Sequence, residues 1–269
     1  MIVFTTREGR VAIVTGAAGG IGRATALTFA HTGVRVVAAD VNLIGAEETA
    51  QQIIQNGGEA IATRTDVTQA SAVEALVQTA IDHFGRLDYA HNNAGIAYDA
   101  LTDMVATADH TEAMFDRIIS VNLKGVWLCL KYELPRMVAQ GSGAIVNTAS
   151  VLGLVGSKGV AAYVASKHGV AGLTKTAALE YAQYRIRVNA ISAGAMNSQP
   201  TRRSATFRPA RFANGETRKP VASSADAAAI IALVAISRAS PSRLRGAASS
   251  IASPARPSFA RAARPVSPR

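Results

Sequence analysis

Short runs rich in β-branched residues alternate with longer amphipathic stretches through residues 1–198 of this 269-residue chain. Parallel strands connected by helices give this pattern, because each strand of a parallel sheet needs a long crossover before the next one. We expect strands at residues 11–14, 34–39, 60–63, 87–90, 144–147 and 187–191, and helices at residues 21–31, 43–56, 70–84, 111–139 and 161–184. The sequence therefore predicts an α/β fold, a Rossmann-type doubly wound sheet of at least six parallel strands with its ligand crevice at their carboxyl ends.

The charge of the chain is concentrated near its carboxyl end. The formal net charge is +10, yet residues 1–200 hold only 15 of the 28 Lys and Arg and 16 of the 18 Asp and Glu. Residues 201–269 also carry seven of the nine prolines. We therefore predict a single Rossmann domain at 1–198, followed by an atypical Arg/Pro/Ala/Ser-rich segment at 199–269. Three interpretations of that segment stay open: a GC-rich gene read in a shifted frame, a native basic tail, and a disordered, solvated extension.

Composition excludes several classes of protein. With 49% hydrophobic and 17% charged residues, the chain can bury a core, so most of its length is not disordered. Cys129 is the single cysteine and cannot form an internal disulfide. The first ten residues lack the apolar stretch of a secretory signal, and the longest apolar run, 227–236, is about half of what spans a membrane. We expect a cytoplasmic protein with no membrane partner.

A glycine-rich segment, residues 15–22, follows the first expected strand and opens the first expected helix. Glycines at Gly16, Gly20 and Gly22 would let the backbone turn tightly and approach a pyrophosphate. The amino terminus of the helix would then present free N–H groups to the phosphates. A glycine-rich turn with no ligand is the alternative.

Asp40 ends the second expected strand, 18 residues after Gly22. A carboxylate at this place can accept hydrogen bonds from both hydroxyls of an adenosine ribose and would repel a 2′-phosphate. The position therefore favours NAD over NADP. Asp40 could instead cap the helix that follows.

Two further polar segments lie at the carboxyl ends of strands. Asp66 and Val67 follow the third expected strand, and the Asn-Asn-Ala-Gly sequence at 92–95 follows the fourth. One cofactor could contact both segments and the glycine turn, because the carboxyl ends of parallel strands meet at one rim. For 92–95 the alternative is an ordinary turn.

Tyr163 and Lys167 are four residues apart on an expected helix, so both side chains lie on one face. A nearby ammonium favours the phenolate and lowers the pKa of a tyrosine, which makes it a usable base. A tyrosine that packs beside a lysine by chance is the alternative. Ser150 lies on the crevice rim just beyond the fifth expected strand, and Asn122 is an amide in a mostly apolar stretch that needs a partner.

Together these motifs resemble the classical short-chain dehydrogenase/reductase family over about residues 8–198. Thr-Gly-x-x-x-Gly-Ile-Gly, Asn-Asn-Ala-Gly and Tyr-x-x-x-Lys occur in the order and approximate spacing of that family. The resemblance implies an NAD-dependent oxidoreductase that interconverts a secondary alcohol and a ketone by hydride transfer. It implies that Tyr163 is the general acid/base and that Lys167 lowers the pKa of Tyr163 and binds the nicotinamide ribose. It further implies that Ser150 holds the reacting oxygen and that Asn122 holds a water molecule of a proton relay.

The resemblance also implies which residues contact the cofactor. Gly19 stands where members that prefer NADP often have a basic residue, which agrees with Asp40. No metal site is expected. The implied cofactor contacts are Gly16, Gly19, Gly20, Ile21, Gly22, Asp40, Asp66, Val67, Asn93, Ala94, Gly95, Tyr163, Lys167, Gly194 and Ser198.

The chain departs from the family pattern in three places. Residues 100–111 are a few residues longer than usual, and Ala193-Gly194 replaces the usual Pro-Gly. Beyond Ser198 the usual substrate lid, helix and last strand are not recognisable. We therefore predict that the last strand is missing and that residues after about Arg238 are irregular. The family commonly forms tetramers, and we expect assembly here to stop at a helix-paired dimer or to be unstable.

Two other functions remain open at this stage. One is a protein that binds a nucleotide without turnover. The other is nucleic-acid binding through the basic segment, which has only Phe207, Phe212 and Phe259 for stacking. We expect a small-molecule alcohol or ketone as the partner and no nucleic acid. The apolar residues at 151–155 favour a hydrophobic or alicyclic secondary alcohol.

Overall fold

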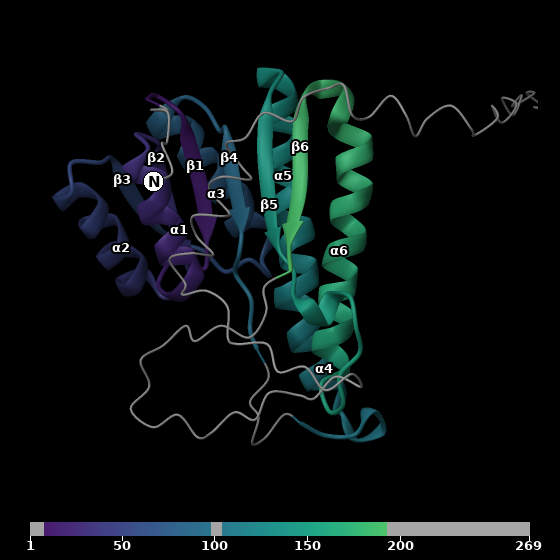
Figure 1. Ribbon diagram of the computed structural model, residues 1–269. Helices are drawn as coiled ribbons and strands as arrows, with labels where there is room; N and C mark the ends of the chain where they lie inside the picture. Colours follow the sequence, from purple (N-terminus) through teal and green to yellow (C-terminus); the bar gives the residue numbers. More distant parts are fainter. Residues whose placement is uncertain (1–7, 98–103, 193–269) are drawn as a thin grey trace, which may run out of the picture. The chain divides into compact units, whose positions relative to one another are not determined.

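The computed structural model describes residues 8–97 and 104–192, which form one parallel sheet with helices on both faces (Figure 1). Its six strands pair in the order β3-β2-β1-β4-β5-β6. The order reverses between β1 and β4, and ligands of such sheets bind outside the carboxyl ends of the strands at that point. The strands are β1 (Val11–Thr15), β2 (Arg35–Asp40), β3 (Ala60–Arg64), β4 (Tyr89–Asn92), β5 (Gly143–Thr148) and β6 (Ile186–Ile191).

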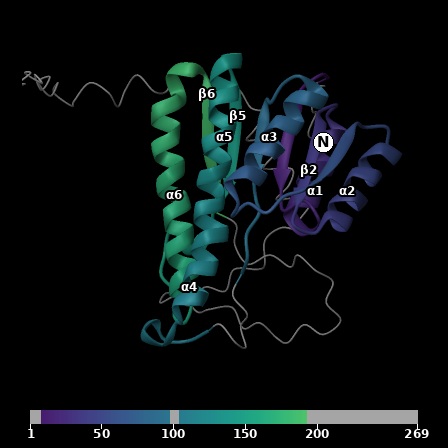
Figure 2. The ribbon, with the colours of Figure 1, turned by 180° about the vertical axis from the view of Figure 1, so that it is seen from behind.

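Helices cover the two faces of the sheet as two separate apolar layers. Along β1, Val11 and Ile13 pack into the layer of α3, α5 and α6, whereas Ala12 and Val14 pack into the layer of α1 and α2. This alternation follows from the two-residue period of a strand. Figure 2 views the molecule from behind. The helices are α1 (Gly20–His31), α2 (Leu43–Gln55), α3 (Ala70–Phe84), α4 (Glu112–Ile119), α5 (Gly125–Gln140) and α6 (Ala161–Tyr181).

The helix predicted at 111–139 is wrong as a single element. The chain forms α4, then a π-helical turn at Ser120–Lys124, then α5. Five-residue π turns inside helices occur frequently at functional sites. The interruption places Asn122, which is fully buried, at the centre of the turn. The helix predicted at 161–184 ends at Tyr181 and continues as a 3₁₀ turn, Ala182–Tyr184.

Several predictions fall on residues outside the described ranges. These are the missing lid and last strand, the irregular segment after Arg238, the lengthened part of 100–103, and the cofactor contacts Gly194 and Ser198. They stay predictions. Among the described residues, no helix is long and apolar enough to cross a membrane, and no cluster of His, Cys, Asp or Glu could hold a metal ion.

Candidate functional site

The glycine turn between β1 and α1 has the backbone geometry that the sequence predicts. Gly16 and Gly20 have φ angles of +69° and +53°, in the region where a Cβ is strained. A Cβ on Gly22 would collide with the carbonyl oxygen of Gly16. Gly19 is different, because a Cβ there would meet nothing within 4 Å. The turn therefore requires glycine at three of these four positions.

The amino terminus of α1 opens directly onto this turn. Gly19 provides no capping side chain, and the first turn of the helix has no acidic residue. The N–H groups and the positive end of the helix dipole are therefore available to an anion. Carbonyl oxygens on the other side of the turn are held by Arg23, which donates to Ala18 at 2.6 Å, and by Thr49, which donates to Ala17 at 2.7 Å.

Asp40 lies beside the glycine turn at the carboxyl end of β2. Its carboxylate accepts hydrogen bonds from the backbone N–H of Ala18 at 3.0 Å and of Asn42 at 2.9 Å. The side chain that caps α2 is Asn42, which accepts from the N–H of Gly45. The interpretation of Asp40 as the helix cap is therefore wrong. A carboxylate offers about four acceptor positions, so two remain for a ligand.

Asp66 and Val67 lie at the carboxyl end of β3. Asp66 accepts hydrogen bonds from the N–H and the hydroxyl of Thr68, at 2.9 and 2.8 Å, which stabilises the turn into α3. Val67 is buried and packs so closely against Gly125 that a Cβ on that glycine would lie 2.8 Å from it. These two residues therefore fix the local backbone of the rim.

The Asn-Asn-Ala-Gly segment connects β4 to the glycine turn. Asn93 donates from Nδ2 to the carbonyl oxygens of Thr15, at 3.1 Å, and Gly16, at 3.3 Å. The N–H groups of Asn93 and Ala94 both donate to the Thr15 hydroxyl, at 3.0 and 3.1 Å. The segment is therefore a clamp between β1 and β4 at the point where the strand order reverses, and the ordinary-turn interpretation is wrong.

Asn122 has the partner that its position demands. Its side-chain oxygen accepts from the N–H of Ile96 at 2.8 Å, and its Nδ2 donates to the carbonyl oxygen of Ile96 at 2.9 Å. A Cβ on Gly95 would lie 3.2 Å from Asn122 Oδ1 and 3.7 Å from Lys167 Nζ. The amide therefore holds the segment after β4 close to Lys167.

Lys167 and Tyr163 lie together on one face of α6, and Lys167 meets the end of β5. The Lys167 amino group lies 5.6 Å from the centroid of the Tyr163 ring and donates to the carbonyl oxygen of Thr148 at 2.8 Å. Only 4% of Lys167 is exposed, and burial lowers its pKa to about 8. At neutral pH the amine is therefore still mostly charged, and a charged amine in this place can stabilise negative charge on a neighbouring phenol.

Ser150 lies at the same rim, two residues beyond β5. It is 7% exposed, and its oxygen accepts from the N–H of Leu152 at 3.2 Å. The 3₁₀ turn that follows, Val151–Gly153, packs against α6, because a Cβ on Gly153 would lie 2.7 Å from the carbonyl oxygen of Lys167. The hydroxyl is therefore fixed relative to the helix that bears Tyr163 and Lys167.

Asn92, the first residue of the Asn-Asn-Ala-Gly segment, belongs to a set of buried polar residues whose other members sequence reasoning missed. Glu133 on α5 is 1% exposed, and burial raises its pKa to about 7. Asn92 donates to Glu133 and to Asn147, each at 3.0 Å, and Asn147 donates to Thr174 at 2.9 Å. Asn92 and Asn147 are polar residues within strands, a sequence signal that could have identified them, because such groups are buried only with partners. Glu133 and Thr174 lie on helices, where this strand signal does not apply.

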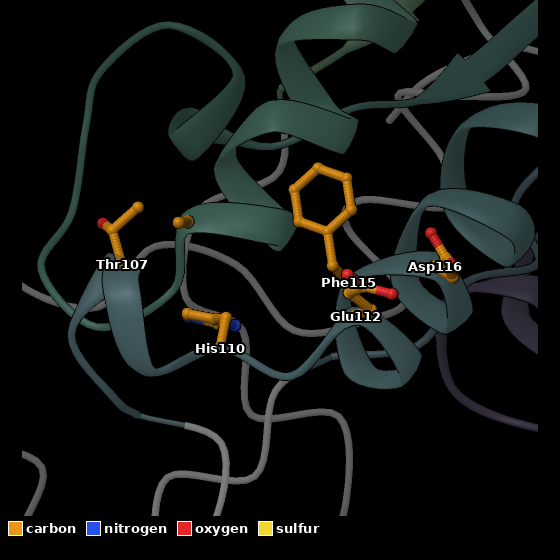
Figure 3. Close-up of a pocket in the computed structure, with 6 residues that line it drawn as sticks. Thr107, His110, Glu112, Phe115 and Asp116 are labelled. Atoms are coloured by element: carbon orange, nitrogen blue, oxygen red, sulfur yellow. The ribbon is translucent and has the colours of Figure 1, made fainter.

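A cavity of about 300 Å³ lies beside α4 and the first residue of α6 (Figure 3). Both ring nitrogens of His110 are buried there, with no hydrogen bond to any described residue. Sequence reasoning did not predict this cavity. One residue that lines it, Ala161, is two residues before Tyr163 on α6. The residues that line it are Thr107, His110, Glu112, Phe115, Asp116 and Ala161.

The fold and the site define a class of enzyme, the short-chain dehydrogenases. The family model described as short chain dehydrogenase matches residues 10–208, and the chain belongs to that family. The family resemblance that the sequence motifs predict is confirmed. The glycine turn, the clamp at 92–95 and the Tyr163–Lys167 pair all lie within the matched range.

Particular relatives narrow the comparison. A cyclohexanol dehydrogenase from Acinetobacter sp. (strain SE19) is 44% identical over 185 residues, which are 69% of this chain and 72% of that protein. The crystal structure of a levodione reductase superposes with a TM-score of 0.74 at 34% identity, over 84% of this chain and 90% of that one. The crystal structure of an NAD⁺-bound xylitol dehydrogenase superposes with a TM-score of 0.68 at 38% identity, over 71% and 72% of the two chains.

Proposed function

We propose that this oxidoreductase uses NAD to interconvert a secondary alcohol and a ketone, with Tyr163 as the general acid/base. The observation that carries the proposal is the buried ammonium of Lys167, 5.6 Å from the Tyr163 ring and hydrogen-bonded to Thr148. A charged group that is both desolvated and fixed in this way favours the phenolate strongly. The tyrosine can then accept the proton of an alcohol near neutral pH.

The residues of the chain divide the work between binding and proton transfer. The glycine turn and the amino terminus of α1 would hold the pyrophosphate, Asp40 the adenosine ribose, and Lys167 the nicotinamide ribose. The nicotinamide supplies the hydride acceptor or donor. Tyr163 removes the hydroxyl proton during oxidation and returns it during reduction. Ser150 donates a hydrogen bond to the reacting oxygen, and Asn122 keeps the segment after β4 in place.

Charge at the end of β2 supports NAD as the cofactor. The Asp40 carboxylate lies next to the glycine turn, where a 2′-phosphate would face a like charge. The glycine at position 19 adds no basic side chain to the turn. The similarity to an NAD⁺-bound xylitol dehydrogenase agrees with this choice.

Apolar side chains next to Ser150 support a hydrophobic or alicyclic substrate. Val151, Leu154 and Val155 are 39%, 62% and 45% exposed, so they present apolar surface at the rim where the reacting oxygen would lie. The similarity to a cyclohexanol dehydrogenase agrees with a ring-shaped alcohol.

A groove on the long helices supports a paired assembly. Leu123, Trp127 and Leu173 line an apolar groove of about 470 Å³ across the π turn, α5 and α6. Trp127 is 44% exposed, which is unusual for a large apolar side chain. We propose that a second copy of the chain covers this groove in a helix-paired dimer.

A dehydrogenase screen tests the proposal. The full chain is mixed with NAD⁺ and a panel of secondary alcohols that includes cyclohexanol, and NADH formation is followed by absorbance. We expect turnover with apolar or alicyclic members and little with short, polar ones. NADH fluorescence that changes on binding, with no alcohol oxidised and no ketone reduced, would favour the alternative of nucleotide binding without turnover.

A further inference from the structure

A chain of partly buried hydrogen bonds joins the Asn-Asn-Ala-Gly clamp to Lys167. His91 on β4 is fully buried, and its Nε2 lies 2.9 Å from the hydroxyl of Thr148 at the end of β5. That hydroxyl lies 3.3 Å from Oδ1 of Asn93. Through its backbone carbonyl oxygen, Thr148 also accepts the 2.8 Å hydrogen bond from Lys167. Thr148 is therefore bonded both to the clamp on the glycine turn and to the lysine beside Tyr163.

The orientation of the Asn93 amide fixes the direction of the next hydrogen bond. Asn93 Nδ2 lies 3.1 Å from the carbonyl oxygen of Thr15 and 3.3 Å from that of Gly16. Carbonyl oxygens only accept, so the amide nitrogen faces them and Oδ1 faces Thr148. Because Oδ1 also only accepts, the Thr148 hydroxyl donates its one proton to Asn93.

The direction of that bond sets the protonation of His91. The Thr148 hydroxyl has no second proton, so the imidazole must donate to it from Nε2. Nδ1 is then the bare nitrogen, and it is buried with no hydrogen bond to any described residue. A proton on Nδ1 would be an unpaired buried donor, which is unfavourable. Burial lowers the pKa of His91 to about 3, in agreement with a neutral ring.

We propose that His91, as the neutral Nε2–H tautomer, and Thr148 are positioning residues of this oxidoreductase. The imidazole orients the Thr148 hydroxyl toward Asn93, which holds the carbonyl groups of the glycine turn. The same residue presents its carbonyl oxygen to Lys167. Nucleotide binding and the placement of the lysine therefore depend on one threonine. The proposal of a role in the reaction rests on the proposed function, whereas the tautomer does not.

Nuclear magnetic resonance tests the tautomer on the unmodified sequence. The chain has five histidines, and long-range ¹H–¹⁵N spectra of the labelled full chain distinguish protonated from bare ring nitrogens. The His91→Gln variant identifies the His91 signals by their loss. We expect a proton on Nε2 and a bare Nδ1 at about pH 8 and unchanged at about pH 5, well above the lowered pKa. An Nδ1–H tautomer, or an imidazolium at about pH 5, would overturn the proposal.

Substitutions at Thr148 test the positioning role. Thr148→Val keeps the shape and the backbone carbonyl but removes the hydroxyl, which leaves Oδ1 of Asn93 and Nε2–H of His91 unpaired. One buried hydrogen bond corresponds to about a tenfold change in an equilibrium constant. We therefore expect Thr148→Val to weaken NADH binding about tenfold and to raise the KM for NAD⁺, with a smaller fall in kcat. Thr148→Ser, which restores the hydroxyl, should return both values to within about twofold.

The matched control is Thr79→Val on α3, where Thr79 is half-buried and its hydroxyl makes a solvent-exposed hydrogen bond to the carbonyl oxygen of Ala75 in the same helix. It should change neither NADH affinity nor KM. If Thr148→Val also leaves NADH affinity unchanged, or if Thr148→Ser fails to restore it, the positioning role is refuted. If Thr148→Val does not fold, the tautomer measurement on the unmodified chain decides whether His91 donates to the Thr148 hydroxyl as proposed. A chain that binds NADH but oxidises no alcohol contradicts the proposed function, while NADH affinity still reports on Thr148.

Discussion

The amino group of Lys167 lies 5.6 Å from the centroid of the Tyr163 ring, one helical turn away on α6. Lys167 reaches the carboxyl end of β5, where it donates to the carbonyl oxygen of Thr148. Burial lowers the pKa of Lys167 to about 8, so the group is desolvated yet remains mostly cationic at neutral pH. This combination of burial and positive charge makes the lysine an electrostatic partner of the tyrosine.

Tyr163→Phe should abolish turnover and leave NADH binding nearly unchanged, because the variant loses only the hydroxyl that transfers the proton. General acid/base groups contribute about 10²- to 10⁴-fold to rates, so kcat should fall by at least about 100-fold. Lys167→Ala should reduce both kcat and NADH affinity, because this side chain would also bind the ribose. Steady-state kinetics and NADH fluorescence titration measure the two effects.

The control for this pair is Tyr184→Phe, which removes the hydroxyl of a tyrosine that is 42% exposed, beyond the end of α6. It should behave as the unmodified chain does. Substantial activity in Tyr163→Phe would contradict the assignment of the base. Loss of NADH binding in the same variant would indicate a structural tyrosine.

Cofactor preference should depend on Asp40. Asp40→Ala removes the like charge that a 2′-phosphate would meet, so the preference for NAD over NADP should narrow by about tenfold or more, as expected for about 1.4 kcal/mol of lost repulsion. Arg64 is the register partner of Asp40 across β2 and β3 and supplies a cation on the neighbouring strand. Asp40→Ala combined with Arg64→Ala should therefore accept NADP less well than Asp40→Ala alone. Calorimetry with both cofactors measures the ratio, and equal affinities in the unmodified chain would contradict the prediction.

The fold was predictable because its signals are local. Glycines at positions 16, 20 and 22 are required by backbone geometry alone, and the two-residue period of β1 separates the apolar layers. The break of the predicted helix at the π turn was not predictable, because α4 and α5 flank it with ordinary helical sequence. The π turn that breaks the helix contains Asn122, which is hydrogen-bonded to Ile96 in a distant part of the chain.

The site was predictable only in part, because its sequence motifs identify the chemical groups of the site but not the distant residues that these groups contact. Tyr163 and Lys167 follow from a four-residue spacing within one helix. His91 and Glu133 depend on contacts between distant strands and helices, namely Thr148 for the first and Asn92 for the second. No local pattern encodes such contacts.

Stability should depend on pH through the two buried groups His91 and Glu133. Burial raises the pKa of Glu133 from 4.5 to about 7, so the folded chain binds this proton more tightly than the unfolded one. The contribution of Glu133 to the free energy of unfolding therefore falls as pH rises from about 4.5 to 7. Burial lowers the pKa of His91 from 6.5 to about 3, so the contribution of His91 to the free energy of unfolding falls as pH drops from about 6.5 to 3. Between about pH 4.5 and 6.5 the two slopes oppose each other, and we expect a plateau there.

Glu133→Gln isolates the carboxyl contribution. Glutamine does not titrate, so the variant loses the fall in the free energy of unfolding that Glu133 causes above about pH 4.5. The free energy of unfolding of the variant minus that of the unmodified chain should therefore be larger at about pH 8 than at about pH 5, by roughly 1–3 kcal/mol. Urea unfolding at both pH values measures the difference. The control is Glu180→Gln, at an exposed position on α6. Its free energy of unfolding should differ from that of the unmodified chain by the same amount at both pH values. A Glu133→Gln effect that is independent of pH would contradict the prediction.

Assembly should depend on the apolar groove that Trp127 and Leu173 line. If a second copy covers this groove, Trp127→Glu replaces a large apolar contact with a charged group in a desolvated interface, which costs several kcal/mol. Light scattering should therefore report a dimer for the unmodified chain and a monomer for Trp127→Glu. Ile54→Glu is the matched control, because Ile54 on α2 is 55% exposed, comparable with Trp127 at 44%, and does not line the groove. A dimer that survives Trp127→Glu, or one that Ile54→Glu also disrupts, would contradict pairing through α5 and α6. A protease-resistant tetramer with an intact carboxyl terminus would contradict the separate prediction that assembly stops at the dimer.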